Sequence, residues 1–120
     1  MRLASYPFVV CGDIGDNLEK IKKAILKAYE NKADLIIFPE CALTGYPPRD
    51  IAGLDSINVN VVFGTIQEFQ KLADELDIHI IVGTIDYADS KYYNRAYLMS
   101  PNETKRWYDK QALYGSDKKG

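Results

Sequence analysis

The apolar residues of this chain recur at two different spacings. In residues 16–31 and 60–76 they fall three or four positions apart, with charged side chains between them. That period places the apolar side chains on one stripe of a helix, so each segment is predicted to form an amphipathic helix. Asp16 is followed three residues later by Glu19, a capping-box spacing, which predicts that the first helix begins at Asp16.

Five other segments carry short apolar or alternating runs that predict strands. They are residues 2–11, 34–38, 78–87, 92–99 and 104–110. The runs at 34–38 and 78–87 are almost continuously apolar, which is typical of strands buried on both faces. Turn-forming residues at 100–103 predict that the last two strands form a hairpin.

The order of these elements predicts an α/β fold with a mixed sheet. A strand–helix–strand–helix–strand order implies parallel strands joined by crossover helices, and the last strands then extend the sheet in antiparallel fashion. Two helices cover only one face of such a sheet, although its central strands are apolar on both. We therefore expect another sheet, a partner chain or further sequence to cover the second face. On this interpretation residues 1–120 form one partial domain without an internal boundary.

Composition and charge exclude several classes of function. The 120 residues are 47% hydrophobic, which excludes wholesale disorder, and their net charge of −2 gives no basic surface for nucleic acid. No apolar stretch is long enough for a membrane helix, and the first residues lack a secretion signal, so a cytoplasmic location is expected. Cys11, Cys41 and His79 are too few for a structural metal site, and no phosphate-binding glycine motif is present. We therefore expect neither a metal nor a cofactor.

Two charged residues follow predicted strands, where the sites of α/β sheets form. Glu40 lies two residues beyond a buried strand, and a partly desolvated carboxylate there suits proton transfer. Lys110 ends the last predicted strand, where a cation stabilises a developing oxyanion. From position alone, a turn-capping Glu40 and a solvated Lys110 are the simpler interpretations. Cys41 adjoins Glu40, but neighbouring side chains on a turn point apart, so Cys41 is not favoured as a nucleophile.

Several of these segments together resemble one family. Asp-Leu-Ile-Ile-Phe-Pro-Glu at 34–40, followed by Ala-Leu-Thr-Gly-Tyr at 42–46, resembles the glutamate motif of the nitrilase, or carbon–nitrogen hydrolase, superfamily. Tyr-Asp-Lys-Gln-Ala-Leu at 108–113 resembles its lysine motif, and Tyr-Asn-Arg-Ala at 93–96 resembles the preceding strand. Within the superfamily, the run at 45–50 and the Lys-Gln pair at 110–111 are most similar to the glutaminase domain of glutamine-dependent NAD synthetases.

The resemblance implies both a fold and a chemistry. The family fold is a four-layer α-β-β-α sandwich, and this chain resembles its first half. The family mechanism implies that Glu40 takes the proton from a cysteine thiol, that the thiolate forms a thioester with the substrate, and that Lys110 stabilises the oxyanion. Tyr46 matches a tyrosine that lines the substrate pocket. The implied substrate is a small amide such as glutamine.

The sequence also departs from the family pattern. The family's nucleophilic cysteine follows the lysine at a distance that falls outside this chain, whereas Cys11 and Cys41 match ordinary positions. Tyr6 stands where relatives often carry a polar amide, and the run at 113–115 is shorter than the family pattern. We therefore expect a carbon–nitrogen hydrolase fragment that has no turnover alone.

Two other interpretations stay open at this point. One is a non-catalytic α/β module that associates through its uncovered sheet face. The other is an unrelated small α/β binding domain with chance motif matches. Because an uncovered apolar sheet face is rare on a soluble monomer, we also expect a homo-oligomer, with a two-fold dimer as its simplest form.

Overall fold

The computed structural model describes residues 2–5, 12–45, 50, 51 and 53–113, with the backbone alone for 111–113. The helices are α1 (Ile14–Glu30), the short 3₁₀ helix η1 (Leu54–Ser56) and α2 (Val59–Leu76). The strands are β1 (Leu3–Ser5), β2 (Leu35–Ile37), β3 (His79–Ala88), β4 (Lys91–Met99) and β5 (Arg106–Leu113). The predicted order of strands and long helices is confirmed.

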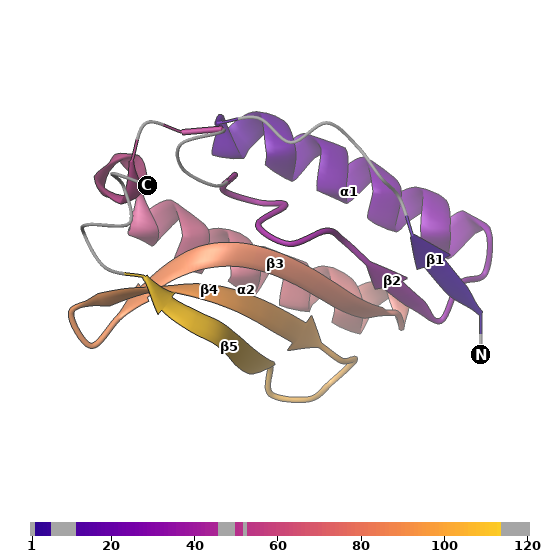
Figure 1. Ribbon diagram of the computed structural model, residues 1–120. Helices are drawn as coiled ribbons and strands as arrows, with labels where there is room; N and C mark the ends of the chain where they lie inside the picture. Colours follow the sequence, from indigo (N-terminus) through magenta and orange to yellow (C-terminus); the bar gives the residue numbers. More distant parts are fainter. Residues whose placement is uncertain (1, 6–11, 46–49, 52, 114–120) are drawn as a thin grey trace.

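The strands form one mixed sheet in the order β1-β2-β3-β4-β5. β1, β2 and β3 are parallel, and β4 and β5 extend the sheet in antiparallel fashion, as predicted. Because the two crossovers advance in the same direction along the sheet, right-handed connections place both helices on one face. Figure 1 shows α1 and α2 on that face, and Lys22 of α1 pairs with Glu68 of α2 at 2.9 Å.

The core lies between this face and the two helices. The apolar stripes of both helices are buried, as their spacing predicted. Fully or nearly fully buried side chains come from α1 (Ile21, Ile25, Ala28), from α2 (Val62, Ile66, Phe69, Ala73) and from the sheet (Ile36, Ile80, Val82, Met99). The alternation of a strand explains why Ile36, Ile80 and Met99, which are paired across the sheet, all point into this core.

The helix starts differ from the prediction. α1 begins at Ile14 because the side chain of Asp13 accepts hydrogen bonds from the backbone N–H groups of Gly15 (2.9 Å) and Asp16 (3.4 Å). Asp16 therefore lies in the first turn and pairs with Lys20 at 3.6 Å, so its prediction as the helix start is wrong. α2 is capped in the same way by Asn58 and begins one residue earlier than predicted.

The strand ends also differ in detail. β2 is limited to Leu35–Ile37, and β5 begins at Arg106 and continues beyond Lys110 to Leu113. Of the predicted first strand, residues 3–5 are in β1, and 6–11 lie outside the described residues. The β4–β5 register contains a bulge: Arg95 pairs with Asp109 and Asn94 with Gln111, which leaves Lys110 as the extra residue of β5.

The face opposite the helices, hereafter the open face, has no helix over it in the part of the chain that the structure describes. Strand alternation assigns Leu3, Ile37, Ile81, Leu98 and Tyr108 to this face. Leu3 and Tyr108 are 65% and 68% exposed, whereas Ile36 and Ile80 on the helix-facing side are fully buried. The described residues therefore form two layers, a sheet and its helices, with an apolar second face.

Candidate active site

Glu40 lies on a loop that continues from β2 along the edge of β3. After β2 ends, the backbone N–H of Phe38 donates to the carbonyl of Ile81 (2.9 Å), and that of Leu43 donates to the carbonyl of Gly83 (3.2 Å). Ile85 then donates its backbone N–H to the hydroxyl of Thr44 (3.0 Å). These bonds fix residues 39–45, hereafter the glutamate loop, beyond the carboxyl end of β2 and along the middle of β3.

The absence of a side chain at Gly83 lets this loop lie against the open face. A Cβ atom at Gly83 would stand 2.8 Å from the backbone nitrogen of Cys41 and 3.1 Å from the Cα atom of Glu40. The first distance is shorter than real Cβ contacts, so any larger residue displaces the loop. Cys41 itself has a left-handed backbone with φ of 55°, which completes the turn just after Glu40.

The two oxygens of the Glu40 carboxylate accept hydrogen bonds from two different strands. The Nζ atom of Lys110 in β5 donates to Oε2 at 2.9 Å. The Nδ2 atom of Asn94 in β4 donates to Oε1 at 2.5 Å. Seventy residues separate Glu40 from Lys110 in sequence, so the predicted approach of these two side chains is confirmed. Its predicted place at the strand ends is wrong for Lys110, because β5 continues to Leu113.

The Glu40–Lys110 pair is open to the outside. The side chains of Lys110 and Glu40 are 46% and 52% exposed. A carboxylate and an ammonium held 2.9 Å apart on an accessible surface provide a proton acceptor and a positive charge at one point. That combination suits a reaction in which one group moves a proton while the other stabilises negative charge.

Asn94 was missed by the sequence reasoning. It is almost completely buried, and its amide bridges Glu40 and the thiol of Cys41, which donates to Oδ1 at 3.6 Å. The available signal was its type: asparagine is disfavoured inside strands, and a buried amide requires partners. The amide fixes the orientation of the Glu40 carboxylate, so Asn94 belongs to the candidate site.

The other residues singled out from sequence lie as follows. The Cys41 thiol is buried on the inner side of the glutamate loop, with only 1% of the residue exposed. The ring of His79 contacts the hydroxyl of Ser100 (3.0 Å), and His79 is the first residue of β3, four positions before Gly83, to which the glutamate loop bonds. Tyr46, Tyr6 and Cys11 lie outside the described residues.

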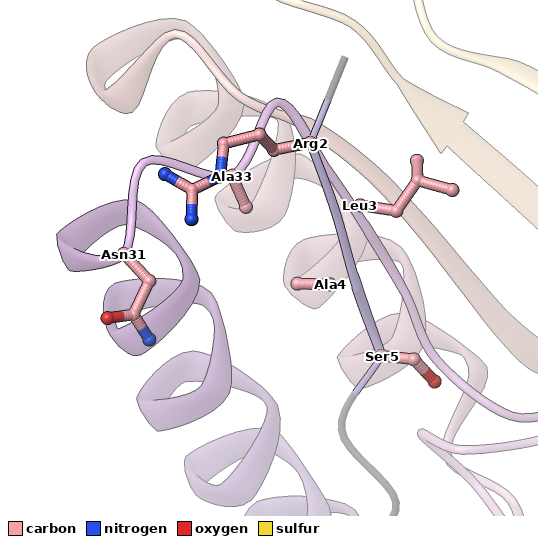
Figure 2. A pocket seen from close by; sticks show the side chains of 6 residues that line it. All are labelled: Arg2, Leu3, Ala4, Ser5, Asn31 and Ala33. Atoms are coloured by element: carbon pink, nitrogen blue, oxygen red, sulfur yellow. The ribbon is translucent and has the colours of Figure 1, made fainter.

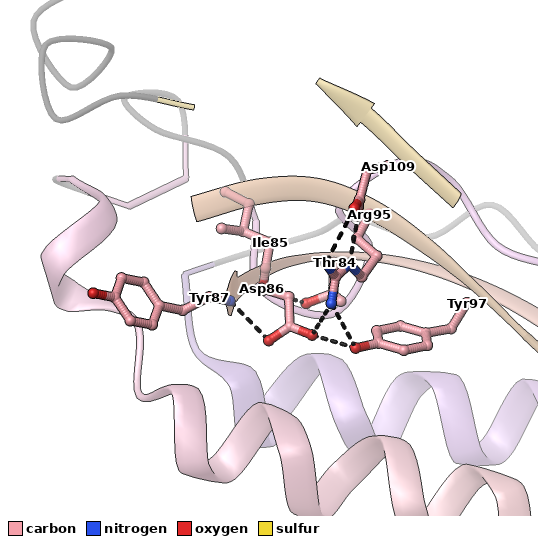
Figure 3. Close-up of polar contacts among 7 residues, drawn as sticks. All are labelled: Thr84, Ile85, Asp86, Tyr87, Arg95, Tyr97 and Asp109. Carbon is pink, nitrogen blue, oxygen red and sulfur yellow. Dashed lines mark hydrogen bonds and ion pairs between the residues drawn. The ribbon is translucent and has the colours of Figure 1, made fainter. Parts of the chain in front are cut away.

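The opposite face of the sheet carries a buried ionic network directly behind the site (Figure 3). Arg95 donates to both oxygens of Asp109, from Nε at 2.5 Å and from Nη2 at 3.1 Å. Its Nη1 atom donates to Asp86 at 3.3 Å, and the Tyr97 hydroxyl also donates to Asp86. All four residues lie on the helix-facing side, where Arg95 is only 8% exposed.

This network shifts two pKa values. Burial raises the pKa of the Tyr97 hydroxyl to about 12, and the hydrogen bond to Asp86 acts in the same direction. Burial acts to lower the pKa of Arg95, but hydrogen bonds to Asp109 and Tyr97 outweigh burial and raise it. Arg95 is therefore a permanent cation at the centre of the network, and Tyr97 is a neutral donor.

Three hollows lie apart from Glu40 and Lys110. One, with a volume of about 470 Å³, lies beside β1. Figure 2 shows the residues that line it, which are Arg2, Leu3, Ala4, Ser5, Asn31 and Ala33. One of about 400 Å³ lies next to the Arg95 network, and an apolar one of about 310 Å³ lies along β4 and β5.

Among the described residues no group of three or more His, Cys, Asp or Glu is placed to hold a metal ion. Neither long helix in that part of the chain combines the length and hydropathy needed to cross a membrane.

Comparison with known proteins gives the family. Residues 2–117 match the sequence profile of the family described as Carbon-nitrogen hydrolase. The chain is 36% identical over 111 residues to a glutamine-dependent NAD(+) synthetase of Synechocystis sp., covering 85% of this chain and 19% of that protein. It is 33% identical over 103 residues to a synthetase of the same name from Thermotoga maritima, covering 85% of this chain and 17% of that protein.

Solved structures show the same fold. An amidase from Nesterenkonia sp. superposes with a TM-score of 0.79 at 24% identity, covering 99% of this chain and 46% of the amidase. A glutamine-dependent NAD+ synthetase from Acinetobacter baumannii superposes with a TM-score of 0.71 at 29% identity, covering 98% of this chain and 22% of that chain. This chain thus spans about a fifth of the length of the synthetases. On the match over residues 2–117, the chain belongs to the carbon–nitrogen hydrolase family.

Proposed function

We propose that this chain provides the proton-transfer and oxyanion-stabilising residues of an amide-hydrolysing site, with glutamine as the substrate. The observation that carries the proposal is the Glu40 carboxylate held by Lys110 of β5 and Asn94 of β4 on the open face of the sheet. The choice of glutamine is supported by the names of the synthetases to which the chain is similar. In such a protein the released ammonia would supply a synthetase domain. Family membership does not favour the alternative of a non-catalytic association module.

The proposed reaction has two halves, and in each of them Glu40 acts first as a general base. In the first half, Glu40 takes the proton from a cysteine thiol, and the thiolate attacks the amide carbon to form a tetrahedral oxyanion. Lys110 stabilises that oxyanion. The intermediate collapses to a thioester as the leaving nitrogen receives the proton from Glu40 and departs as ammonia. In the second half, Glu40 takes a proton from water, the water oxygen attacks the thioester, and the thiol is regenerated with the carboxylic acid product.

Asn94 has a defined part in this scheme. Its amide holds Oε1 of Glu40, so the carboxylate cannot rotate freely when Lys110 turns from Oε2 toward the oxyanion. Holding a base within hydrogen-bond reach of its proton is what makes general base catalysis effective. Asn94 is therefore proposed as a positioning residue for Glu40.

The nucleophile is proposed to be a cysteine other than Cys41. The Cys41 thiol is buried and donates to Oδ1 of Asn94, so it is not accessible to a substrate beside the exposed Glu40 carboxylate. Cys11 lies outside the described residues, and the family resemblance assigns it no catalytic role. The nucleophile is then supplied from outside the 120 residues, in a second half of a four-layer sandwich. Tyr46 is proposed to line the substrate pocket.

The test is a chimaera in which residues 2–117 replace the matching segment of the Synechocystis synthetase. The proposal expects the folded chimaera to release ammonia from glutamine. The unmodified synthetase in the same assay is the positive control. A folded chimaera that releases no ammonia, while the control does, would contradict the proposal.

The chain alone provides a second test. We expect no ammonia from glutamine, because no placed thiolate is available to form the thioester. A burst of ammonia that disappears in the Cys41→Ala variant would make Cys41 the nucleophile and overturn that part of the mechanism.

A further inference from the structure

We propose that the ion pair between Arg95 and Asp109, on the helix-facing side of the sheet, positions the two donors that hold Glu40 on the open face. The inference deepens the proposed function, because it takes Glu40 and Lys110 as the reacting pair. Arg95 and Asp109 do not touch the site, so both are positioning residues.

Both residues of the ion pair are chain neighbours of the two donors. Arg95 directly follows Asn94, and Asp109 directly precedes Lys110. Arg95 and Asp109 are also register partners across β4 and β5. Successive side chains of a strand point to opposite faces. The ion pair on the helix-facing side therefore fixes the backbone of β4 and β5, from which Asn94 and Lys110 project to the open face.

The bulge makes such a clamp necessary. Lys110 is the extra residue of β5, so its own position is not fixed by a paired residue in β4. A shift of one residue in a strand moves a side chain to the opposite face, which would take Lys110 away from Glu40. The Arg95–Asp109 pair stands immediately before the bulge and opposes that shift.

The pair is itself well held. The guanidinium binds both carboxylate oxygens of Asp109, and such bidentate pairs are directional as well as strong. A further bond to Asp86 at 3.3 Å and the rings of Tyr93 and Trp107, at 5.3 and 5.2 Å from the guanidinium carbon, confine Arg95 from other sides. Because the guanidinium is confined, it restricts the positions of Asn94, its chain neighbour, and of Asp109, its ion-pair partner.

The chain contains a matched control. Lys22 and Glu68 join α1 to α2 with the same 2.9 Å between Nζ and a carboxylate oxygen that separates Lys110 from Glu40. Both pairs consist of partly exposed lysine and glutamate side chains, so a reagent reaches each of them. The helix pair joins α1 to α2 and shares no residue with β4 or β5, so its product should not respond to changes at Arg95 or Asp109.

The experiment treats the 120-residue chain with a water-soluble carbodiimide, which joins a carboxylate and an amine in contact as an amide with loss of one water. Peptide mass spectrometry then measures the Glu40–Lys110 and Lys22–Glu68 products in the same sample. In Asp109→Ala we expect the Glu40–Lys110 yield, relative to Lys22–Glu68, to fall about fivefold, the order of the coupling between groups of one network. Arg95 retains Asp86 as a partner in this variant, which favours retention of the fold.

Two further variants make the result decisive. Arg95→Lys keeps the positive charge but cannot bind both carboxylate oxygens of Asp109 as the planar guanidinium does. It should lower the ratio of the Glu40–Lys110 product to the Lys22–Glu68 product. Glu68→Gln should abolish the helix product and leave the Glu40–Lys110 yield at the parent level. An unchanged ratio in both Asp109→Ala and Arg95→Lys would overturn the proposal, and so would an equal fall of both products, which would reveal general loosening. Since no turnover is measured, this outcome is independent of whether the chain serves glutamine hydrolysis.

Discussion

The hydroxyl of Tyr97 is buried against the Asp86 carboxylate, and this links the stability of the fold to alkaline pH. The pKa of Tyr97 is raised to about 12 from its usual 10.0, so the folded state holds this proton more tightly than the unfolded chain. The stability that Tyr97 contributes is therefore complete below pH 10 and is lost as the pH rises from 10 toward 12.

We expect the Tyr97→Phe variant to show a weaker dependence on alkaline pH. Between pH 10 and 12 the parent should lose about 2 kcal/mol more of its free energy of unfolding than Tyr97→Phe does. Urea unfolding at a series of pH values measures both slopes. Tyr108→Phe is the control, because it makes the same substitution at an exposed position. Parallel curves for parent and Tyr97→Phe would contradict the burial of this proton.

Among individual residues, Glu40 and Lys110 could be predicted from the sequence. Asn94, Arg95 and Asp109, which hold them in place, could not. Glu40 and Lys110 are charged residues at predicted strand ends within recognisable motifs. Asn94 lies within a strand. Its role depends on the face to which it points and on the position of the glutamate loop over that face, and neither is visible in the local sequence. The pairing of Arg95 with Asp109 depends on strand register, which local sequence does not specify.

Among the elements, the order of strands and helices was predictable because each carries its own apolar period. The helix starts were not fully predictable, because Asp13 and Asp16 both offer a capping carboxylate, and the sequence does not show that Asp13 is the one that accepts the first backbone N–H groups. The bulge at Lys110 was not predictable either. Sequence alternation alone predicts a regular strand through Lys110, whereas the extra residue appears only when β4 and β5 are paired.

Two glycines provide a matched test of how the elements hold the glutamate loop. Gly83 in β3 lies under the loop, whereas a Cβ atom at Gly64 in α2 would meet nothing within 4 Å. We expect Gly83→Ala to lower the free energy of unfolding by about 1–3 kcal/mol, because the loop must move. Gly64→Ala should raise it by up to about 1 kcal/mol through helix propensity.

Urea unfolding measures both changes, and the carbodiimide product of Glu40 and Lys110 reports on the loop directly. That product should decrease in Gly83→Ala and stay at the parent level in Gly64→Ala. A Gly83→Ala variant with parent stability and parent yield would show that the loop does not depend on this close approach.

At the scale of the whole fold, the described residues present an apolar sheet face that α1 and α2 do not cover. The sequence predicted this face from the number of helices, and exposed Leu3, Ile37 and Tyr108 on the open face agree with that prediction. Which chain covers the face could not be predicted, because an apolar surface is not specific for one partner. In the proposed four-layer sandwich a second sheet lies there, about 10 Å away.

We expect the 120-residue chain to self-associate through the open face. Sedimentation at micromolar concentration should detect a dimer, because uncovered apolar faces of this kind are rare on monomers. Ile37→Lys on the open face should favour the monomer, whereas Leu26→Lys, an exposed position on α1, should not. A monomeric parent that binds no apolar dye would contradict the expected association.

The central claim is that Glu40 moves protons in amide hydrolysis, and the most direct measurement is kcat for glutamine in the chimaera carrying residues 2–117. Glu40→Gln keeps the size of the side chain but cannot accept a proton, so kcat should fall by about 10²–10⁴-fold. Glu68→Gln makes the same chemical change on α2 and should leave kcat at the parent value. A Glu40→Gln chimaera with the kcat of its parent would contradict the account.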